Sequence, residues 1–411
     1  MKVIHINTSD TGGAGRAVYR LHKSLTKIGL NSEMWVNTSN NKDSSVKSPN
    51  NIKSKFLSLL RRNLKKTLMM FVKTKNPILH SPSFLPSSWV KKINSSDADI
   101  VNLHWVQHEM LSVSDISKIK KPLVWTLHDM WGFCGAEHVS WDNRWKEGYD
   151  YHNRLKNENG FDINRWTWVR KVKYWKKPIK IIAPSIWLKR CVNESKLMRG
   201  WPCKTIPNTI DTNFWKPTIK YLARRSLNFS QKSYILAFGS SNAIQEPHKG
   251  FDLLLEALQK IKKEKLINLE LVIFGQKKIS RSIQLDIPFY NIGFLKNVDL
   301  KELYNAVDAV VVPSRLEAFG QIASEASACE TPVIAFNTSG LKDIVIHKVT
   351  GYLAKQFDVE DLSKGIVWVL ENSEIKQLGY NARKHVLDNF SNNLVAKKYL
   401  ETYKEILNNN F

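Results

Sequence analysis

Two acidic residues of this chain, Glu317 and Glu325, stand on either side of an expected junction between a strand and a helix. The run Ala309–Val312 is short, apolar and β-branched, which favours a parallel strand buried on both faces, whereas the residues around Glu325 favour a helix. Glu317 would then lie in the loop and Glu325 inside the helix. Because a carboxylate accepts hydrogen bonds from vicinal hydroxyl groups, one glutamate suits a sugar and the other a ribose. Two exposed glutamates on an amphipathic helix would show the same spacing.

The backbone between these glutamates is a candidate site for an anion. The amides of Phe319, Gly320 and Gln321 would lie at the start of the helix, where backbone N–H groups lack partners and the helix dipole is positive. In an α/β domain this position opens on the crevice at the carboxyl end of the strand. We therefore expect a diphosphate here, between two hydroxyl-binding carboxylates, as in a nucleotide sugar.

A lysine occupies a similar position after an earlier strand candidate. The apolar run Tyr234–Gly239 ends in a glycine, and Lys249 stands just before the next expected helix. A lysine at such a crossover supplies charge-assisted hydrogen bonds to phosphate, although alone it would be an ordinary surface lysine. We expect Gly239 and Lys249 to contribute to the same anion site.

Strands and helices alternate along both halves of the chain, which predicts two α/β domains with parallel sheets. A chain of 411 residues also exceeds what one hydrophobic core usually fills. We expect a first domain over residues 1–215, a second over residues 216–391, and a last helix within residues 392–411 that returns to the first. Thr212–Lys232 has no clear period and is the expected linker. The strand candidates are Lys2–Asn7, Glu33–Val36, Asp99–His104, Leu123–His128, Lys180–Ala183, Thr205–Pro207, Tyr234–Gly239, Glu270–Gly275, Tyr290–Phe294, Ala309–Val312, Val333–Phe336 and Gly351–Ala354.

The composition is that of a globular protein with an excess of basic residues. Lysine and arginine number 62 and aspartate and glutamate 37, and the net charge of +25 should attract nucleic acid or anionic lipid. The four cysteines have no paired spacing, which argues against a disulfide framework and a zinc site. The start of the chain is too short and polar for a signal peptide, and no apolar run is long enough to span a membrane. We expect a cytoplasmic protein that could also lie on the inner face of the cytoplasmic membrane.

Part of the positive charge lies in the segment Ile52–Lys75, which has eight basic residues and no acidic one. Its apolar residues recur every four positions, so one face of the expected helix is apolar and the rest is basic. Such a helix could lie on an anionic membrane surface, or it could face the core with its lysines in water, and both interpretations stay open. The apolar positions are Phe56, Leu60, Leu64, Leu68 and Val72, joined by Leu57 and Phe71.

The interval Trp141–Trp187 interleaves tryptophans with lysines and arginines. Aromatic faces beside cations serve carbohydrate, nucleic acid and interfacial lipid alike. The interval could equally be a structural excursion, so the pattern alone assigns it no ligand.

These features, together with the turn Pro207–Asp211, resemble the retaining glycosyltransferases of family 4 over nearly the whole chain. The resemblance implies the GT-B fold, in which two Rossmann-like α/β domains with parallel sheets face each other across a cleft. It implies that Glu317 and the backbone of Phe319–Gln321 hold the transferred sugar. It also implies that Glu325 binds the ribose hydroxyls and that Lys249 holds the diphosphate, which makes Glu317 and Lys249 candidates for catalysis.

In the first half, the resemblance places the loop Gly12–Gly15 and His128 at the cleft, near the reacting sugar. A glycine such as Gly13 lets the backbone approach a donor, and His128 could donate a hydrogen bond to a sugar hydroxyl. His104 and Asp129 occupy comparable strand ends. His128 is the catalytic candidate among the three.

The implied reaction transfers a sugar, with retention, from a nucleoside-diphosphate sugar to a glycan acceptor. The segment His128–Phe133 resembles family members that act on lipid-linked bacterial surface polysaccharides such as O-antigen. The departing phosphate would help deprotonate the incoming hydroxyl, so no protein nucleophile is needed. No cofactor and no metal are expected, because Lys249 and the helix-end amides can carry the charge of the leaving group. The run Asp97–Asp99 looks like the metal-binding aspartates of the other large glycosyltransferase fold, but it comes before the expected strand and not after it.

One part of the family pattern is missing. Family members often place an arginine shortly before the lysine, whereas here the loop Ser240–Pro247 is longer and contains none. The cation that would act beside Lys249 stays open, with His248 and Arg315 as candidates.

Other classes of protein share parts of this pattern. The run Gly13–Val18 partly matches a dinucleotide fingerprint, but its third glycine is missing, which argues against a dehydrogenase. A sugar-nucleotide epimerase of similar fold is an alternative that would need no acceptor. A basic nucleic-acid-binding protein is another, but no recognised module occurs and both glutamates would go unexplained. We therefore expect no nucleic-acid partner.

Overall fold

The computed structural model describes residues 1–49, 52–156, 158–240, 246–261, 268–276, 285–372 and 375–408, without the side chains of residues 52–59, 62 and 375. The chain divides into two compact units. The first comprises Met1–Thr209 with Val395–Phe411, and the second comprises Ile210–Leu394. The first unit therefore ends at Thr209, whereas we expected this boundary at residue 215.

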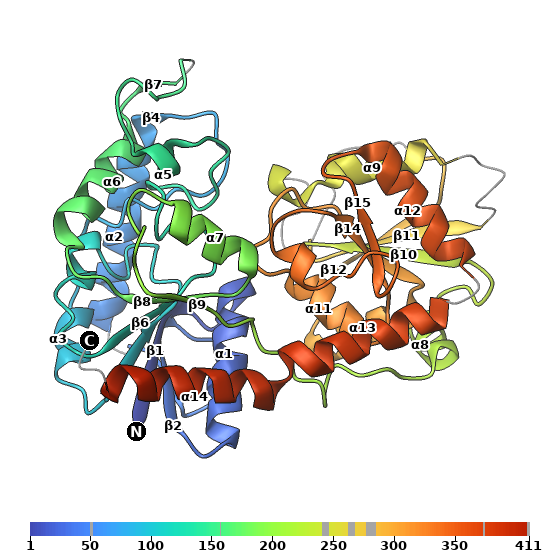
Figure 1. Ribbon diagram of the computed structural model, residues 1–411, viewed down its shortest axis with the longest axis horizontal. Coiled ribbons are helices and arrows are strands. Elements are labelled where there is room, and N and C mark those ends of the chain that lie inside the picture. The colour runs from blue at the N-terminus through green and yellow to red at the C-terminus, as the bar shows by residue number, and fades with distance from the viewer. Residues whose placement is uncertain are drawn as a thin grey trace. The chain divides into compact units, whose positions relative to one another are not determined.

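The first unit is built around a parallel sheet, for which the described residues give seven strands in the order β3-β2-β1-β5-β6-β8-β9 (Figure 1). A separate pair, β4 with β7, is antiparallel. The strands are β1 (Lys2–Ser9), β2 (Asn31–Thr38), β3 (Val46–Lys47), β4 (Val72–Lys73), β5 (Ile100–Leu103), β6 (Leu123–Thr126), β7 (Asn159–Gly160), β8 (Lys180–Ala183) and β9 (Cys203–Thr205). The helices are α1 (Gly12–Lys27), α2 (Ile52–Met70), α3 (Trp89–Asn94), α4 (Val113–Ile116), α5 (Arg144–Glu147), α6 (Ile163–Tyr174) and α7 (Ile186–Glu194).

The last helix of the chain, α14 (Asn392–Asn408), completes the core of this first unit. Its tyrosines Tyr399 and Tyr403 are buried in one cluster with Leu21 and Leu25 of α1 and with apolar residues of β1, β5, β6 and β8. The Asn102 amide donates to the Tyr403 hydroxyl over 2.8 Å, and the Tyr399 hydroxyl lies 3.3 Å from Thr126 Oγ1. Apolar packing and buried hydrogen bonds therefore both fix α14 on this sheet.

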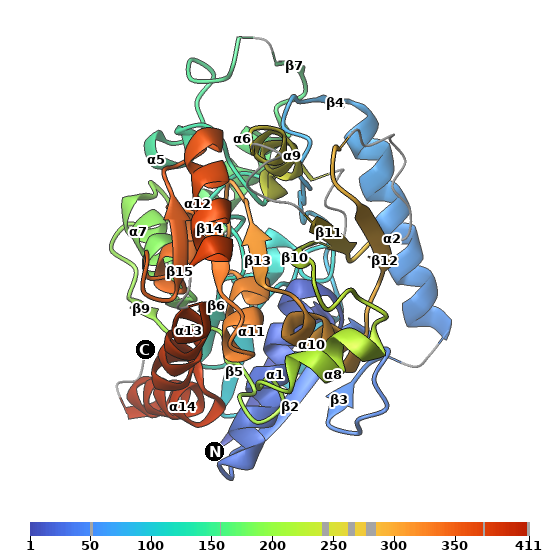
Figure 2. The same cartoon turned by 90° about the vertical axis from the view of Figure 1, so that its right-hand side faces the viewer.

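The second unit is built around another parallel sheet, whose described residues form six strands in the order β12-β11-β10-β13-β14-β15 (Figure 2). The strands are β10 (Tyr234–Gly239), β11 (Leu269–Phe274), β12 (Phe289–Gly293), β13 (Ala309–Val312), β14 (Val333–Phe336) and β15 (Gly351–Ala354). The helices are α8 (Lys220–Ser226), α9 (Phe251–Gln259), α10 (Asn297–Ala306), α11 (Gln321–Ala328), α12 (Val359–Glu371) and α13 (Ile375–Phe390), with short 3-10 turns η1 (Pro247–Lys249) and η3 (Ser339–Asp343).

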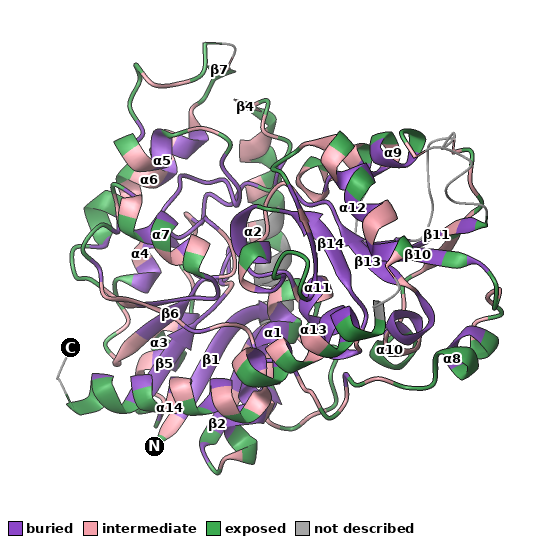
Figure 3. Cartoon of the chain, turned by 45° about the vertical axis from the view of Figure 1, so that its right-hand side comes forward, coloured by how far each residue is buried: buried purple, intermediate pink, exposed green. Residues whose placement is uncertain are grey.

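Both faces of this second sheet are covered. Along β10, Ile235 and Ala237 pack into one cluster with α10, α11 and α13, while Leu236 and Phe238 pack into another with α9 and α12. A strand buried on both faces needs apolar residues at every position, which explains the unbroken apolar runs of the sequence. The central strands of both units are accordingly buried (Figure 3).

The expected α/β fold with two Rossmann-like parallel sheets is confirmed, with differences at some element ends. The strand expected at Thr205–Pro207 lies earlier, at Cys203–Thr205, and β6 ends at Thr126 rather than at residue 128. The expected linker Thr212–Lys232 contains α8 and belongs to the second unit, where Trp215 is buried in the core. The many basic residues of this segment gave no clear helical period in the sequence, although the segment forms a short helix that packs on α10.

The buried hydroxyl of Tyr403 predicts a measurable stability effect. In Tyr403→Phe the Asn102 amide loses its acceptor inside the core, so the free energy of unfolding should fall by about 1–3 kcal/mol. Urea denaturation of the variant tests this, with Tyr380→Phe as the control because Tyr380 is exposed. Equal losses in the two variants would show that the hydrogen bond does not stabilise the fold.

Candidate active site

An ion pair stands where two crossovers of the second unit meet. Lys249 closes the turn η1 between β10 and α9, and Glu317 lies in the loop between β13 and α11. The Lys249 ammonium lies 2.8 Å from Glu317 Oε1, which also accepts a hydrogen bond from the Ser314 hydroxyl over 3.0 Å. The Glu317 amide donates to Ser339 Oγ over 2.9 Å. The fold thus brings together the residues expected to bind the diphosphate and the transferred sugar.

Both members of this pair carry their charges at neutral pH. Burial alone would raise the pKa of Glu317, but the attraction of Lys249 outweighs it and holds that pKa below its ordinary value. Burial would likewise lower the pKa of Lys249, and the attraction of Glu317 raises it instead. A phosphate that binds Lys249 would therefore share it with a carboxylate.

The backbone at the start of α11 has the conformation that glycine permits. Gly320 is the N-cap of the helix at φ 109°, and it has no side chain with which to cap the first amides. The side chain of Phe319 is buried against Phe390, with 5.4 Å between ring centroids. Because Phe319 is anchored in the core, the backbone of Phe319–Gln321 is held in place beside Glu317, as an anion site requires.

Glu325 lies within α11 and is buried, with 2% of its surface exposed. Its Oε2 accepts a hydrogen bond of 3.1 Å from the hydroxyl of Tyr304 in α10, a residue that is itself buried. A ribose hydroxyl would have to share this carboxylate with Tyr304. The ribose role of Glu325 stays a prediction.

Gly239 and the loop after it are described only in part, because residues 241–245 lie outside the described ranges. A Cβ atom on Gly239 would come within 2.2 Å of the Phe274 ring, so this glycine allows β10 and β11 to pack at their ends. The packing explains the glycine without a ligand, and its role as a donor contact stays a prediction.

The two residues considered as a second cation have other partners. Arg315 binds both carboxylate oxygens of Asp252 at 2.8 and 2.6 Å and donates to the carbonyl of Pro247 over 2.7 Å. It therefore ties the turn η1 to the start of α9. Burial lowers the pKa of His248 to about 4, so this ring is neutral at neutral pH. Lys249 carries the positive charge beside Glu317.

In the first unit, the glycine loop opens α1. A Cβ atom on Gly15 would lie 2.6 Å from the backbone of Asp10 and Ser9, whereas one on Gly13 would meet no described atom within 4 Å. Gly15 therefore lets α1 pass close to the backbone of Ser9 and Asp10, which is a different contact from the approach to a donor expected of this loop. The space in front of Gly13 is compatible with a ligand, and its donor contact stays a prediction.

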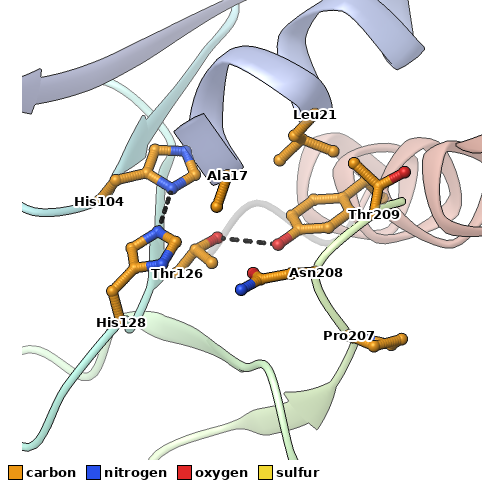
Figure 4. Close-up of a pocket in the computed structure, with 9 residues that line it drawn as sticks. Ala17, Leu21, His104, Thr126, His128, Pro207, Asn208 and Thr209 are labelled. Atoms are coloured by element: carbon orange, nitrogen blue, oxygen red, sulfur yellow. Dashed lines mark hydrogen bonds between the residues drawn. The ribbon is translucent and has the colours of Figure 1, made fainter. Parts of the chain in front are cut away.

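His128 lines a small pocket at the carboxyl ends of β5 and β6 (Figure 4). Its Nε2 lies 3.1 Å from Nδ1 of His104, which lines the same pocket. Asp129, at a comparable position, instead accepts hydrogen bonds from Trp105, Trp131 and His138, so it orders the neighbouring loops. The other residues of the pocket come from α1, β6, the 207–209 segment and α14, and they are Ala17, Leu21, Thr126, Pro207, Asn208, Thr209 and Tyr399.

One arrangement in this unit has the order of a hydrolase triad. His138 Nδ1 lies 2.6 Å from Asp129 Oδ2, and its Nε2 lies 2.9 Å from Ser81 Oγ. A serine nucleophile must reach its substrate, but Ser81 has no exposed surface. These hydrogen bonds therefore stabilise the loops that carry the three residues. The sequence did not predict the arrangement, because its members come from separate loops.

The contacts found in the tryptophan-rich interval Trp141–Trp187 are largely packing contacts within the protein. Lys171 is buried, lies 3.8 Å from the ring centroid of Trp131, and donates to the carbonyls of Trp131, Cys134 and Gly135. These contacts favour the structural interpretation of the interval. Trp141 is exposed and remains available for a ligand.

Comparison with known proteins agrees with this geometry. The model of the family "Glycosyltransferase Family 4" matches residues 11–214, and that of "Glycosyl transferases group 1" matches residues 224–385. An uncharacterized glycosyltransferase of Methanocaldococcus jannaschii is 30% identical over 207 residues, 48% of this chain and 51% of its own. The capsular polysaccharide biosynthesis glycosyltransferase CapM of Staphylococcus aureus is 29% identical over 166 residues, 39% of this chain and 43% of its own. The chain thus spans about half the length of these relatives.

Solved structures show the same fold. HepE of Anabaena, in complex with UDP and glucose, superposes with a TM-score of 0.67 at 17% identity, covering 98% of this chain and 100% of its own. At this identity the likeness shows the fold alone. Together, these matches favour a glycosyltransferase over the sugar-nucleotide epimerase and the nucleic-acid-binding protein.

The charge state of Glu317 predicts a dependence of stability on pH. Its pKa is lowered on folding, so the carboxylate contributes stability above its unfolded pKa of about 4.3, and this contribution is lost on further acidification. At neutral pH, Glu317→Gln should be less stable than the native protein by about 1.5–3 kcal/mol. The difference should shrink when urea denaturation is repeated at pH 3.

A double variant provides the control for this effect. Lys249→Met added to Glu317→Gln removes the unpaired ammonium and should recover part of the lost stability at neutral pH. A difference between the native protein and Glu317→Gln that stayed constant between pH 7 and pH 3 would contradict the ion-pair interpretation.

Proposed function

The chain belongs to the GT-B glycosyltransferases of family 4, and we propose that it transfers a sugar, with retention, from a nucleoside-diphosphate sugar to a glycan. The observation that carries this proposal is the ion pair between Lys249 and Glu317 beside the start of α11, where the N-cap Gly320 provides no side-chain cap. A cation, a carboxylate and helix-end amides are the groups that a diphosphate attached to a sugar requires.

Each group has a distinct role in the proposed site. Lys249 and the amides of Phe319–Gln321 bind the diphosphate, and Glu317 accepts hydrogen bonds from hydroxyls of the transferred sugar. Glu325 accepts from the ribose. Because Lys249 and Glu317 are already bound to each other, they are positioned before the donor arrives, and little reorganisation is needed in the transition state.

The proposed chemistry breaks the bond between the anomeric carbon and the diphosphate oxygen. The acceptor hydroxyl forms the new bond on the same face of the sugar, and its proton passes to an oxygen of the departing phosphate. Lys249 and the amides of α11 stabilise the negative charge that develops on this leaving group. The scheme uses no metal and no cofactor. The proposed role of His128 is to donate a hydrogen bond to a sugar hydroxyl.

We further propose that the acceptor is a lipid-linked intermediate of a surface polysaccharide, such as O-antigen, at the cytoplasmic face of the membrane. The similarity to a capsular polysaccharide glycosyltransferase supports this class of acceptor. No helix in the described part of the chain combines the length and apolar character needed to cross a membrane.

Helix α2 supports an anionic membrane surface as partner. Leu60 and Leu64, one turn apart, are 44% and 45% exposed, and Phe71, just after the helix, is 67% exposed. Arg61 donates to the carbonyl of Glu109 and Lys65 to Ser81 Oγ, so these two basic residues are held on the protein. The interpretation of α2 as a helix with its apolar residues in the core is wrong for Leu60 and Leu64. Phe56 and Leu57 lie outside the described side chains.

The roles of the two glutamates are separable by kinetics. Glu317→Ala should lower kcat by about a hundredfold or more, because its carboxylate acts beside the reacting centre. Glu325→Ala should mainly raise the KM for the donor, by about tenfold, because it removes hydrogen bonds to the ribose. Turnover is measured with the sugar nucleotide selected by thermal-shift screening against UDP, GDP and their sugars. Glu360→Ala is the control, since Glu360 is exposed. Near-normal rates in both variants would refute the proposed site.

Membrane binding is tested by vesicle flotation. The triple variant Leu60→Ser, Leu64→Ser and Phe71→Ser should bind vesicles of anionic lipid at least about tenfold more weakly, because exposed apolar side chains enter the interface. Ile219→Ser is the control, since Ile219 is exposed in the second unit. If the triple variant binds vesicles as well as the native protein does, α2 is not the segment that contacts the membrane.

A further inference from the structure

Three histidines of the first unit form a continuous hydrogen-bonded chain. His5 Nδ1 lies 2.9 Å from His104 Nε2, and His104 Nδ1 lies 3.1 Å from His128 Nε2. The residues come from β1 and from the ends of β5 and β6, strands that are neighbours in the sheet. The chain therefore runs from the interior of the sheet to the pocket that His128 lines.

The two ends of this chain differ. At the interior end, His5 is fully buried and its Nε2 has no hydrogen-bond partner among the described residues. The nearby ring of His22, 6.4 Å away between centroids, binds Ser32 and Ser45 through its two nitrogens. At the other end, Nε2 of His128 is used by His104, which leaves Nδ1 of His128 for the pocket (Figure 4).

All three rings are neutral at neutral pH. Burial lowers the pKa of His5 to about 3 and that of His128 to about 4, and it lowers the pKa of His104 well below its ordinary value. The chain therefore holds three N–H protons on six ring nitrogens.

Proton counting makes the three tautomers interdependent. Each of the two N···N hydrogen bonds needs one proton, so the third proton must lie at one end of the chain. If it lies on His128 Nδ1, all three rings carry their proton on Nδ1. If it lies on His5 Nε2, all three carry it on Nε2. A mixed arrangement would place two protons, or none, between adjacent rings.

We propose that the buried end of this chain fixes His128 as a hydrogen-bond donor, with Nδ1–H directed to the pocket, so that His5 is a positioning residue. A proton on His5 Nε2 would be a buried N–H without an acceptor, and such groups are rarer in proteins than acceptors without a donor.

The consequence for catalysis rests on the proposed function. A neutral donor at His128 can donate a hydrogen bond to an oxygen atom of the sugar in every catalytic cycle, whereas the opposite tautomer presents a lone pair and can only accept a hydrogen bond from a sugar hydroxyl. The tautomer itself can be measured without any substrate, so the inference and the proposed function can fail separately.

Nitrogen NMR of the intact protein with labelled histidines shows which ring nitrogen of each of the three histidines carries the proton. Protonated and bare ring nitrogens resonate far apart, and scalar coupling across each N–H···N bond identifies the bonded pair. We expect protonated Nδ1 and bare Nε2 on His5, His104 and His128. Protonated Nε2 on His104 and His128 would overturn the proposal, as would the absence of coupling between the rings.

A matched pair of variants at position 5 tests its control of the chain. Leucine offers neither donor nor acceptor, so His5→Leu should leave His104 Nε2 bare and His128 with its Nδ1 proton. Methionine has a similar volume, but its sulfur only accepts, so His5→Met should draw a proton onto His104 Nε2 and reverse the chain. We expect His5→Met to lower kcat by about tenfold relative to His5→Leu, with similar donor KM, because the hydrogen bond that His128 donates to the reacting sugar is lost.

The outcomes separate the possible roles of His5. Equal His128 spectra and equal kcat in the two variants would show that residue 5 affects only stability, which overturns the proposal. A reversed His128 tautomer in His5→Met with unchanged kcat would keep the positioning role and refute the role of His128 in transfer. Thermal melts of both variants check that each is folded.

Discussion

The half-buried ion pair between Lys249 and Glu317 is the interaction on which the candidate active site depends. An isolated charge in either position would be costly to bury, and each residue keeps its charge because the other is present. The pair joins two crossovers that are separated by 68 positions in the sequence. It therefore defines the geometry of the site as well as its charge, and Arg315 with Asp252 supports it by holding the turn that carries Lys249.

The parallel sheet imposes where these groups can lie. Strands that are buried on both faces have no room for polar side chains along their length, so polar residues gather at the carboxyl ends. In the second unit these ends carry Ser314, Glu317 and the start of α11. The first unit departs from this rule, because His5 and Asn102 are polar residues inside buried strands. Hydrogen bonds to His104 and Tyr403 offset the cost of burying them.

The sequence predicts the fold better than it predicts the site. Apolar β-branched runs are local signals, which is why strands such as β10, β13, β14 and β15 were located to the residue. The spacing of Glu317 and Glu325 identified the loop and helix that carry them. Lys249 was expected at the same site, but Ser339 and Tyr304 could not be predicted as partners, because they lie in other crossovers and reach the glutamates only through the fold.

The histidine chain and α2 show that a single sequence position does not predict which residues its side chain will contact. His5 stands alone in an apolar strand, where a buried structural histidine has the same appearance, and only the pairing of β1 with β5 brings it to His104. The available signal was the recurrence of polar residues at strand ends, including His104 and His128. Along α2, a period of four separates an apolar face from a basic one. It does not say which face meets the protein, and contacts of Arg61 and Lys65 with distant segments decide that.

The two units handle burial of titratable groups in opposite ways. The second unit pairs a half-buried cation with a half-buried anion, so both stay charged. The first unit links histidines to one another, and none of them can gain a proton without placing a charge in the interior. In the proposed function Lys249 binds the diphosphate, for which a charge is needed, whereas a neutral donor recognises a sugar oxygen by the position of a single hydrogen bond.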